Sequence, residues 1–205
     1  MSARNQLPHL TILLGIIFSA NIQAGTIPTT LAGITLGADI STVAHRCKLS
    51  TDMPLSDERQ LNEIDLKPQF VPGVKSATVA YANCAEKGKI VRIKLKFDNS
   101  SREFFNDLYA MYEKKFGHPE EWRGNPFHSV LSWKWSFKDG RQNVGIELTH
   151  SEDNDYKIGN FVKLTLRSLW ESESICLKKQ ERSSQESETD QKEEKSLDYS
   201  QLIPK

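Results

Sequence analysis

Residues 89–117, KIVRIKLKFDNSSREFFNDLYAMYEKKFG, show two hydrophobic periods in succession, first that of a strand and then that of a helix. The first nine residues alternate strictly, with apolar side chains at positions 91, 93, 95 and 97 and basic side chains at positions 92, 94 and 96. Alternation with a period of two is typical of a strand that is buried on one face. Residues 89–97 therefore predict a strand of an antiparallel sheet whose other face meets solvent.

The second part of this stretch changes to a helical period. Its large apolar residues recur every three or four positions and form one stripe, which consists of Phe104, Phe105, Leu108, Met111, Tyr112 and Phe116. Ser100 and Glu103 have the spacing of a capping box, and Gly117 followed by Pro119 predicts the helix end. We therefore expect a helix that packs its aromatic stripe on the apolar face of the sheet.

Alternation returns after the helix. It predicts three more strands, at residues 131–137, 144–148 and 162–166. Asp139-Gly140 predicts a hairpin turn between the first two. Trp133 and Trp135 share the apolar phase of their strand, so we interpret them as core residues rather than as an aromatic ligand platform.

Upstream of residue 89, the sequence predicts a short helix over 39–47 and a strand over 76–83. The segment 48–74 contains three prolines and is expected to be irregular, with one short element around 64–70. The order of a helix followed by strands thus occurs twice, in 39–97 and in 100–169. Together these patterns predict an α+β fold, with a single antiparallel sheet of about five strands and a helix on one face.

The two ends of the chain predict export and disorder. Arg4, the apolar run 10–18 and Ala24 before Gly25 form the pattern of a signal peptide over residues 1–24. The apolar run is about half the length that crosses a bilayer, so an uncleaved anchor is the less favoured alternative. Residues 25–170 form the predicted α+β domain, and the polar, charged residues 171–205 are predicted to be a disordered tail. The expected location is the periplasm or the secreted fraction.

Export makes the three cysteines oxidisable. Cys47 and Cys84 fall inside the predicted domain and Cys176 lies just beyond it, so we predict a Cys47–Cys84 disulfide. Cys176 would then be free or paired between molecules. No cysteine or histidine pair has the spacing of a structural zinc site, and we expect no metal and no cofactor.

The sequence favours a binding protein over an enzyme. The histidines after the predicted cleavage site are His45, His118, His128 and His150, and none belongs to a pattern that defines an activated nucleophile. An acidic loop with Glu152, Asp153 and Asp155 lacks the ligand spacing of a calcium loop and is interpreted as a solvated turn. The net charge of the chain is +0, which gives no long-range field that would favour nucleic acid.

One surface feature is a candidate binding site. Seven basic residues occupy the polar phase of three predicted strands or follow them directly: Arg92, Lys94, Lys96, Lys134, Lys138, Lys163 and Arg167. If the strands share one sheet, these side chains gather on its open face, where Glu147 partly interrupts them. The alternative interpretation is a solvated face that discourages pairing with other chains.

Two short motifs carry a resemblance to known proteins. Gly33-Ile34-Thr35-Leu36-Gly37 before a short helix, and Phe116-Gly117-His118-Pro119 before an aromatic strand, resemble small exported α/β modules of Gram-negative bacteria. The architecture predicted for residues 31–169 is similar to that of the β-lactamase inhibitory protein and of the small lipoprotein of the outer-membrane β-barrel assembly machine. The chain departs from the lipoprotein because the residue directly after the predicted cleavage site is Gly25 and not a cysteine that could be lipidated. The resemblance implies a protein that acts by binding proteins.

These observations lead to one functional hypothesis and two alternatives. We expect an exported periplasmic binding or accessory protein that recognises a protein or an anionic envelope component, and no nucleic acid. The binding residues would be Arg92, Lys94, Lys96, Lys134, Lys163 and Arg167. The alternatives are a small hydrolase-type enzyme that uses His45, His118 or His128 with a carboxylate, and a small-ligand carrier with the 48–74 loop as a lid.

Overall fold

The computed structural model describes residues 27–68, 71–153 and 158–194 of the 205-residue chain. Its strands are β1 Thr30–Leu31, β2 Ile34–Thr35, β3 Met53–Pro54, β4 Leu61–Asp65, β5 Val74–Ala82, β6 Ile90–Phe97, β7 Glu121–Gly124, β8 Val130–Asp139, β9 Gln142–Ser151 and β10 Gly159–Leu166. Its helices are the 3-10 helices η1 Ile40–Arg46 and η2 Leu49–Thr51, and the α-helices α1 Arg102–Phe116 and α2 Arg167–Glu194. The predicted signal peptide lies outside the described residues.

Within these ranges, eight strands form one antiparallel sheet in the order β3-β4-β5-β6-β10-β9-β8-β7. The chain builds one half with β3–β6, crosses through α1 to the opposite edge, and returns through β7–β10 to pair β10 with β6. Strands β1 and β2 form a separate two-stranded sheet. The predicted α+β class is confirmed, whereas the expectation of about five strands in one sheet was too low.

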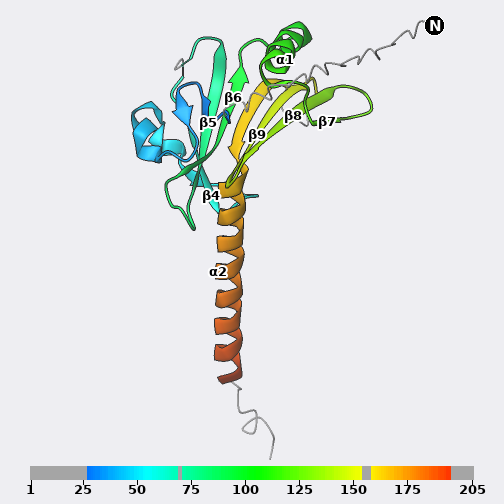
Figure 1. The fold of residues 1–205 in the computed structure, drawn as a ribbon. Helices are drawn as coiled ribbons and strands as arrows, with labels where there is room; N and C mark the ends of the chain where they lie inside the picture. Colours follow the sequence, from blue (N-terminus) through cyan, green and yellow to red (C-terminus); the bar gives the residue numbers. More distant parts are fainter. Residues whose placement is uncertain (1–26, 69–70, 154–157, 195–205) are drawn as a thin grey trace, which may run out of the picture.

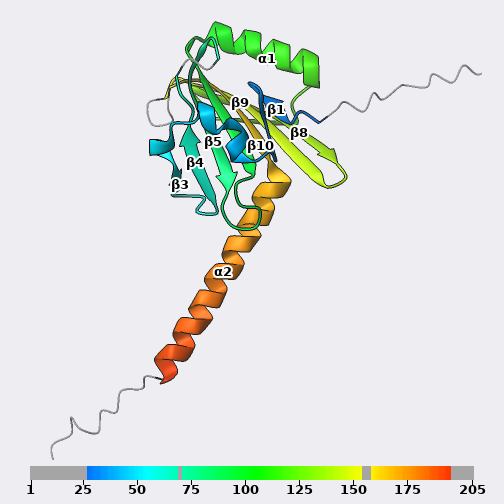
Figure 2. The same ribbon diagram turned by 90° about the vertical axis from the view of Figure 1, so that its left-hand side faces the viewer.

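Helix α1 lies across one face of the sheet, as predicted (Figures 1 and 2). Phe105 is 2% exposed, and its ring centroid lies 5.4 Å from that of His150 on β9. The Tyr109 ring lies 5.3 Å from that of Trp133, and the buried Trp135 donates from its indole nitrogen to the carbonyl of Gly117. Trp133 and Trp135 therefore belong to the packed face, which confirms their interpretation as core residues.

Two details of α1 differ from the sequence prediction. The N-cap is Ser101, whose hydroxyl accepts a hydrogen bond from the amide of Phe104, rather than Ser100. Met111 is 66% exposed and does not join the packed stripe. The helix ends as predicted at Gly117, where φ is 80°, in the region that favours glycine.

A buried polar network fixes the start of α1. The side-chain amide of Asn160 donates to the backbone carbonyls of Asn99 and Ser101, and its oxygen lies 2.7 Å from Nδ1 of His150. Because the Asn160 oxygen is an acceptor, Nδ1 of His150 carries the proton. His150 and Asn160 are both 0% exposed, so this network anchors the helix to the inner face of the sheet.

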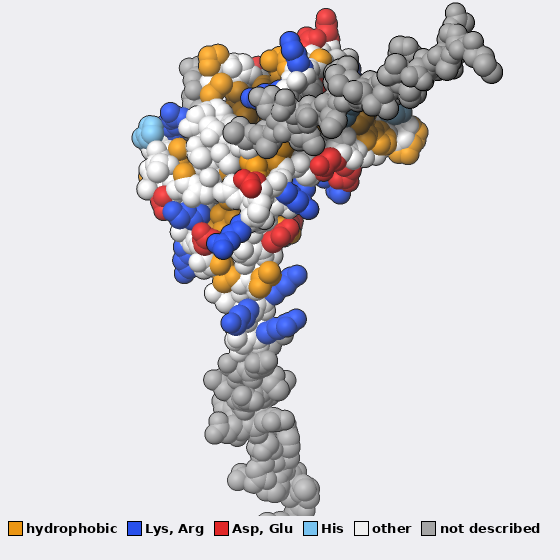
Figure 3. Space-filling model, in the orientation of Figure 1, with side chains coloured by type: hydrophobic (Ala, Val, Ile, Leu, Met, Phe, Trp, Pro, Cys, Tyr) orange, Lys and Arg blue, Asp and Glu red, His pale blue; other side chains and the backbone are white. Residues whose placement is uncertain are grey.

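The prediction of a disordered tail from residue 171 is wrong for residues 171–194. Residues 171–194, which the sequence predicts to be disordered, belong to α2, and α2 continues directly from β10. The whole helix is about 42 Å long, at about 1.5 Å per residue, and its later turns extend away from the sheet (Figure 1). Lys178, Lys179 and Arg182 are exposed on the described part of its surface, and Figure 3 shows Lys and Arg side chains along this part of the molecule.

The first turns of α2 explain why it is ordered. Leu169 is 6% exposed, Glu173 is 0% exposed and Cys176 is bonded to the domain, so one face of the helix is engaged with spacings of four and three residues. The central member of this stripe is Glu173, so the stripe cannot be recognised from hydrophobic residues alone. No helix within the described ranges is long and apolar enough to cross a membrane.

Candidate functional site: a charged groove between the sheet and α2

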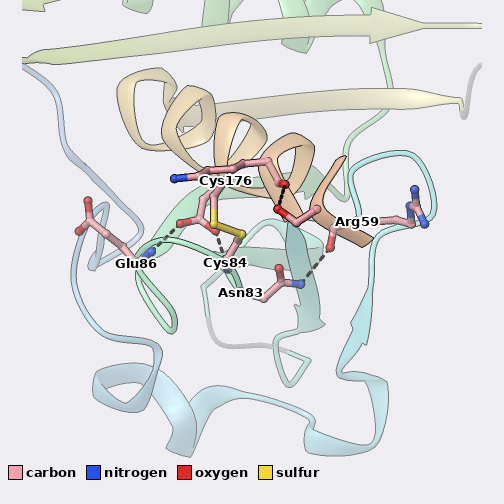
Figure 4. The surroundings of a disulfide bond; sticks show 8 residues. Arg59, Asn83, Cys84, Glu86 and Cys176 are labelled. Carbon is pink, nitrogen blue, oxygen red and sulfur yellow. Dashed lines mark hydrogen bonds between the residues drawn. A yellow bond between two sulfur atoms is a disulfide. The ribbon is translucent and has the colours of Figure 1, made fainter. Parts of the chain in front are cut away.

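A disulfide ties α2 to the sheet. Cys84, in the turn between β5 and β6, is bonded to Cys176, and the two Cα atoms are 5.9 Å apart (Figure 4). Cys47 is free and buried, its thiol donates to the carbonyl of Val43, and burial raises its pKa. The predicted Cys47–Cys84 disulfide is therefore wrong. The backbone of Cys47, which follows η1, forms an isolated antiparallel β-bridge with Leu66. The turn that carries Cys84 faces α2 instead, where Cys176 is its partner.

Glu173 strengthens the same attachment. Its carboxylate accepts hydrogen bonds from the backbone amides of Cys84, at 2.7 Å, and Glu86, at 2.6 Å. Both contacts are drawn in Figure 4 beside the disulfide. One helical turn therefore holds the β5–β6 turn through a covalent bond and through a buried charge with two amide donors. Gln60 adds a hydrogen bond to Ser174, which joins the segment before β4 to the helix.

The fixed start of α2 borders a groove of about 500 Å³ on the polar face of the sheet. Trp170 and Glu171 of α2 line it together with side chains from β6, β7, β8, β9 and β10. Its charged residues are five basic and four acidic ones: Arg92, Arg123, Lys134, Lys163, Arg167, Glu58, Glu121, Glu147 and Glu171. The volume lies within the usual range for ligand sites, but the lining is unusually charged.

The structure brings four of the six predicted binding residues together. Arg92, Lys134, Lys163 and Arg167 all line the groove. Lys94 and Lys96 lie on the same face but outside the groove, with each ammonium nitrogen 5.2 Å from the centre of the Phe161 ring. Lys138, near the end of the β8–β9 hairpin, does not line it.

Acidic residues alternate with basic ones across the floor. Glu121 on β7 is opposite Lys134 on β8, Lys134 is opposite Glu147 on β9, and Glu147 is opposite Lys163 on β10. Opposite charges across neighbouring strands stabilise a sheet by roughly 0.2–1 kcal/mol per pair. The face is therefore charge-compensated rather than uniformly basic, because Glu58, Glu121 and Glu171 join the predicted Glu147.

Glu147 is the best-defined member of this row. Its carboxylate lies 2.9 Å from the Lys163 ammonium and accepts from the Ser132 hydroxyl. Burial raises the pKa of Glu147, but Lys163, Lys134 and the Ser132 hydrogen bond outweigh it and lower the pKa below its ordinary value of 4.5. The charged form is thus the stable form at neutral pH.

We expect Glu147→Gln to destabilise the protein by about 1 kcal/mol at pH 7. A depressed pKa contributes stability above the unfolded-state value and loses it as the pH falls through the folded-state value. The difference between parent and variant should therefore shrink below about pH 4.5. Urea unfolding of both proteins between pH 3 and pH 7 checks this, and a constant difference over that range would contradict it.

Arg92 is paired. Its guanidinium lies 2.7 Å from one oxygen of Glu58, and the other oxygen accepts from the Trp170 indole at 3.1 Å. Glu58 therefore links the connection before β4 to both β6 and α2, and this triad closes one end of the groove.

Arg167 and Lys134 differ from Arg92 in their ion pairing. Among the described residues, neither has a carboxylate within ion-pairing distance. The Arg167 guanidinium donates to the Ser136 hydroxyl at 2.9 Å and lies close above Gly145, where an added Cβ would be 2.3 Å from its Nε. Glycine at position 145 therefore creates the space that lets this guanidinium lie close to the sheet.

The predicted histidine candidates lie elsewhere. His45, His118 and His128 are exposed, and none of them lines the groove. His118 is paired with Glu113 at the end of α1, with its side chain 90% exposed, and His128 lies in the turn before β8. Among the residues that the structure describes, no cluster of three or more His, Cys, Asp or Glu side chains can hold a metal ion, and Asp155 lies outside them.

The fold and groove thus define an α+β protein with a charged, concave sheet face and a helix fixed at its border. Comparison with models of known families, with curated proteins and with solved structures found no match to this chain.

Proposed function

We propose that this protein is an exported binding or accessory protein whose groove receives an anionic group of a partner, either a protein or an anionic component of the cell envelope. The observation that carries the proposal is Arg167, which is held in place above Gly145 with no carboxylate of the described residues within ion-pairing distance. Lys134 supplies a second cation without a close ion pair in the same groove. Guanidinium groups bind carboxylates and phosphates in a bidentate geometry, which suits such a role.

The chemistry of the groove favours recognition over catalysis. Three of its four carboxylates are already in ion pairs, with Arg92, Arg123 and Lys163. Its lining contains no histidine, so no His–carboxylate pair is positioned there for proton transfer. The Cys84–Cys176 disulfide is consistent with an oxidising compartment, which agrees with the signal peptide predicted from the sequence.

The test compares two anionic probes, because the partner is either a protein or an envelope lipid. A peptide of seven glutamates represents an acidic protein segment, and phosphatidylglycerol vesicles represent an anionic membrane surface. We expect one of the two probes to bind, with an affinity that falls steeply between 0.05 M and 0.5 M salt, since the Debye length shortens over that range. Failure of both probes to bind would contradict the proposal.

Variants locate the binding in the groove. We expect Arg167→Gln and Gly145→Ala each to weaken binding of the active probe about tenfold or more, because a hydrogen bond to a charged group contributes about 1.5–3 kcal/mol. Lys138→Gln is the matched control, since it removes an exposed cation of β8 that lies on the same face of the sheet but outside the groove. Isothermal titration calorimetry measures all four proteins. Equal losses in Lys138→Gln and Arg167→Gln would show only a general charge effect.

A further inference from the structure

We propose that a second site, an apolar cavity under the C-terminal half of α1, binds the chain of a free, linear aliphatic carboxylate. The cavity has a volume of about 230 Å³ and lies between α1, β1 and the inner face of the sheet. It is separate from the charged groove, because it opens on the opposite face of the sheet and shares only Ile146 with the groove's lining. Figure 2 shows α1 and β1 on this face of the strands.

The floor of the cavity is formed by the core itself. Ile146, Val162 and Leu164 are 3%, 1% and 2% exposed, and they belong to the central strands β9 and β10. Leu31 of β1 and Phe116 of α1 form apolar walls. A ligand in this cavity would contact aliphatic side chains on several sides, so its inner part must be apolar.

Three polar side chains line the cavity, and the hydroxyl of one of them, Thr30, is already hydrogen-bonded to that of Thr35 at 3.1 Å. Lys115 lines it, is exposed to solvent, and has no ion pair with a described residue. Tyr112 also lines it, and its hydroxyl makes no hydrogen bond with a described residue. Burial raises the pKa of Tyr112 to about 12, so the hydroxyl stays protonated and can donate. One cation and one donor around an apolar space are complementary to a single anionic head on an apolar chain.

The volume sets the length of that chain. A methylene group occupies roughly the volume of a water molecule, ~30 Å³, so the cavity holds about eight carbons. A carboxylate is the head that matches one ammonium and one hydroxyl donor without needing further charges.

The test is a chain-length series on the full exported protein. Hexanoate, octanoate, decanoate and dodecanoate are titrated below their micelle concentrations. Each methylene that enters the cavity should raise the affinity about fourfold, which corresponds to ~0.8 kcal/mol per buried methylene. We expect this rise up to about eight carbons and a gain below twofold per methylene beyond decanoate. No dependence on chain length, or an undiminished rise through dodecanoate, would overturn the proposal.

Variants test the head group and the position. Lys115→Gln should weaken the binding of octanoate at least fivefold and leave the binding of octanol unchanged. Lys114 is the neighbouring exposed lysine outside the cavity, so Lys114→Gln should change the affinity for neither ligand. Leu31→Trp should fill the cavity and weaken all chains, with circular dichroism as the check of folding. Equal binding of octanol and octanoate with no effect of Lys115→Gln would mean a neutral ligand and overturn the anionic assignment. Arg167→Gln should not affect octanoate, which distinguishes this site from the groove.

Discussion

Replacement of either Cys84 or Cys176 by alanine is expected to lower the free energy of unfolding by about 4 kcal/mol. The two cysteines are separated by 92 positions, and closing so long a loop restricts the unfolded chain strongly. For a chain of this size the loss corresponds to a fall in Tm of about 8–16 °C. Thermal unfolding followed by circular dichroism measures it for the parent and both variants.

The control for this prediction is the third cysteine. The double variant Cys84→Ala/Cys176→Ala should lose about as much free energy of unfolding as either single variant, because all three variants lose the same disulfide. Cys47→Ala should cost only about 1 kcal/mol, since it removes one buried thiol. A large loss in Cys47→Ala with little loss in Cys176→Ala would show that the predicted Cys47–Cys84 pair forms instead. Peptide mapping without reduction identifies the linked pair independently.

Replacement of Glu173 by alanine is expected to cost about 3–5 kcal/mol. The change leaves the amides of Cys84 and Glu86 without their acceptor, and each unsatisfied buried donor costs roughly 1–3 kcal/mol. Limited proteolysis should then cut the start of α2 faster than in the parent, because the helix has lost one of its two strong attachments. Urea unfolding gives the free energy.

A glutamate further along the same helix provides the comparison. Glu181 pairs with Arg59, but its side chain is 42% exposed, so Glu181→Ala should cost less than about 1 kcal/mol. If Glu173→Ala is as mild as Glu181→Ala, the buried carboxylate does not hold the β5–β6 turn as described.

The parts of the fold that the sequence predicts well are those with a strict period. Strands β6, β8, β9 and β10 bury their apolar phase, and the charged side chains of the other phase are half-buried or exposed. Helix α1 packs an aromatic stripe on the sheet, so each of these elements shows its period in the sequence. The four-residue strand β7 is exposed throughout and shows no such pattern. Strand β4 is five residues long and lies between segments that contain prolines. The prolines predict irregular structure for the whole stretch, so the strand is not recognised from the sequence.

Helix α2 and the disulfide were missed for the same reason. The contacts of α2 with the domain involve a leucine, a buried glutamate and a cysteine, and a hydrophobicity argument counts only the first of them. A search for positions four and three apart that include Cys176 would have marked Leu169, Glu173 and Cys176 as one helical face. With α2 predicted as a tail, Cys84 had no partner other than Cys47.

The candidate site was half predictable. The phase of the strands placed Arg92, Lys134 and Lys163 on one face, and the structure brings them together in the groove. The compensating carboxylates Glu58 and Glu121 come from segments without a clear period, so the sequence could not place them. The space above Gly145 that receives Arg167 depends on tertiary packing, which has no periodic signal in the sequence.

We propose above that the groove around Arg167 binds an anionic group of a partner. The most direct measurement is a nuclear magnetic resonance titration of the isotope-labelled protein with the seven-glutamate peptide, or with phosphatidylglycerol in nanodiscs if only the lipid binds. We predict that the Arg167 Nε–H signal and the amide signals of Gly145 and Thr165 shift together, and that these shifts are lost in Gly145→Ala. Shifts confined to the exposed residues Lys178, Lys179 and Arg182 of α2, with the groove signals unchanged, would contradict the proposal.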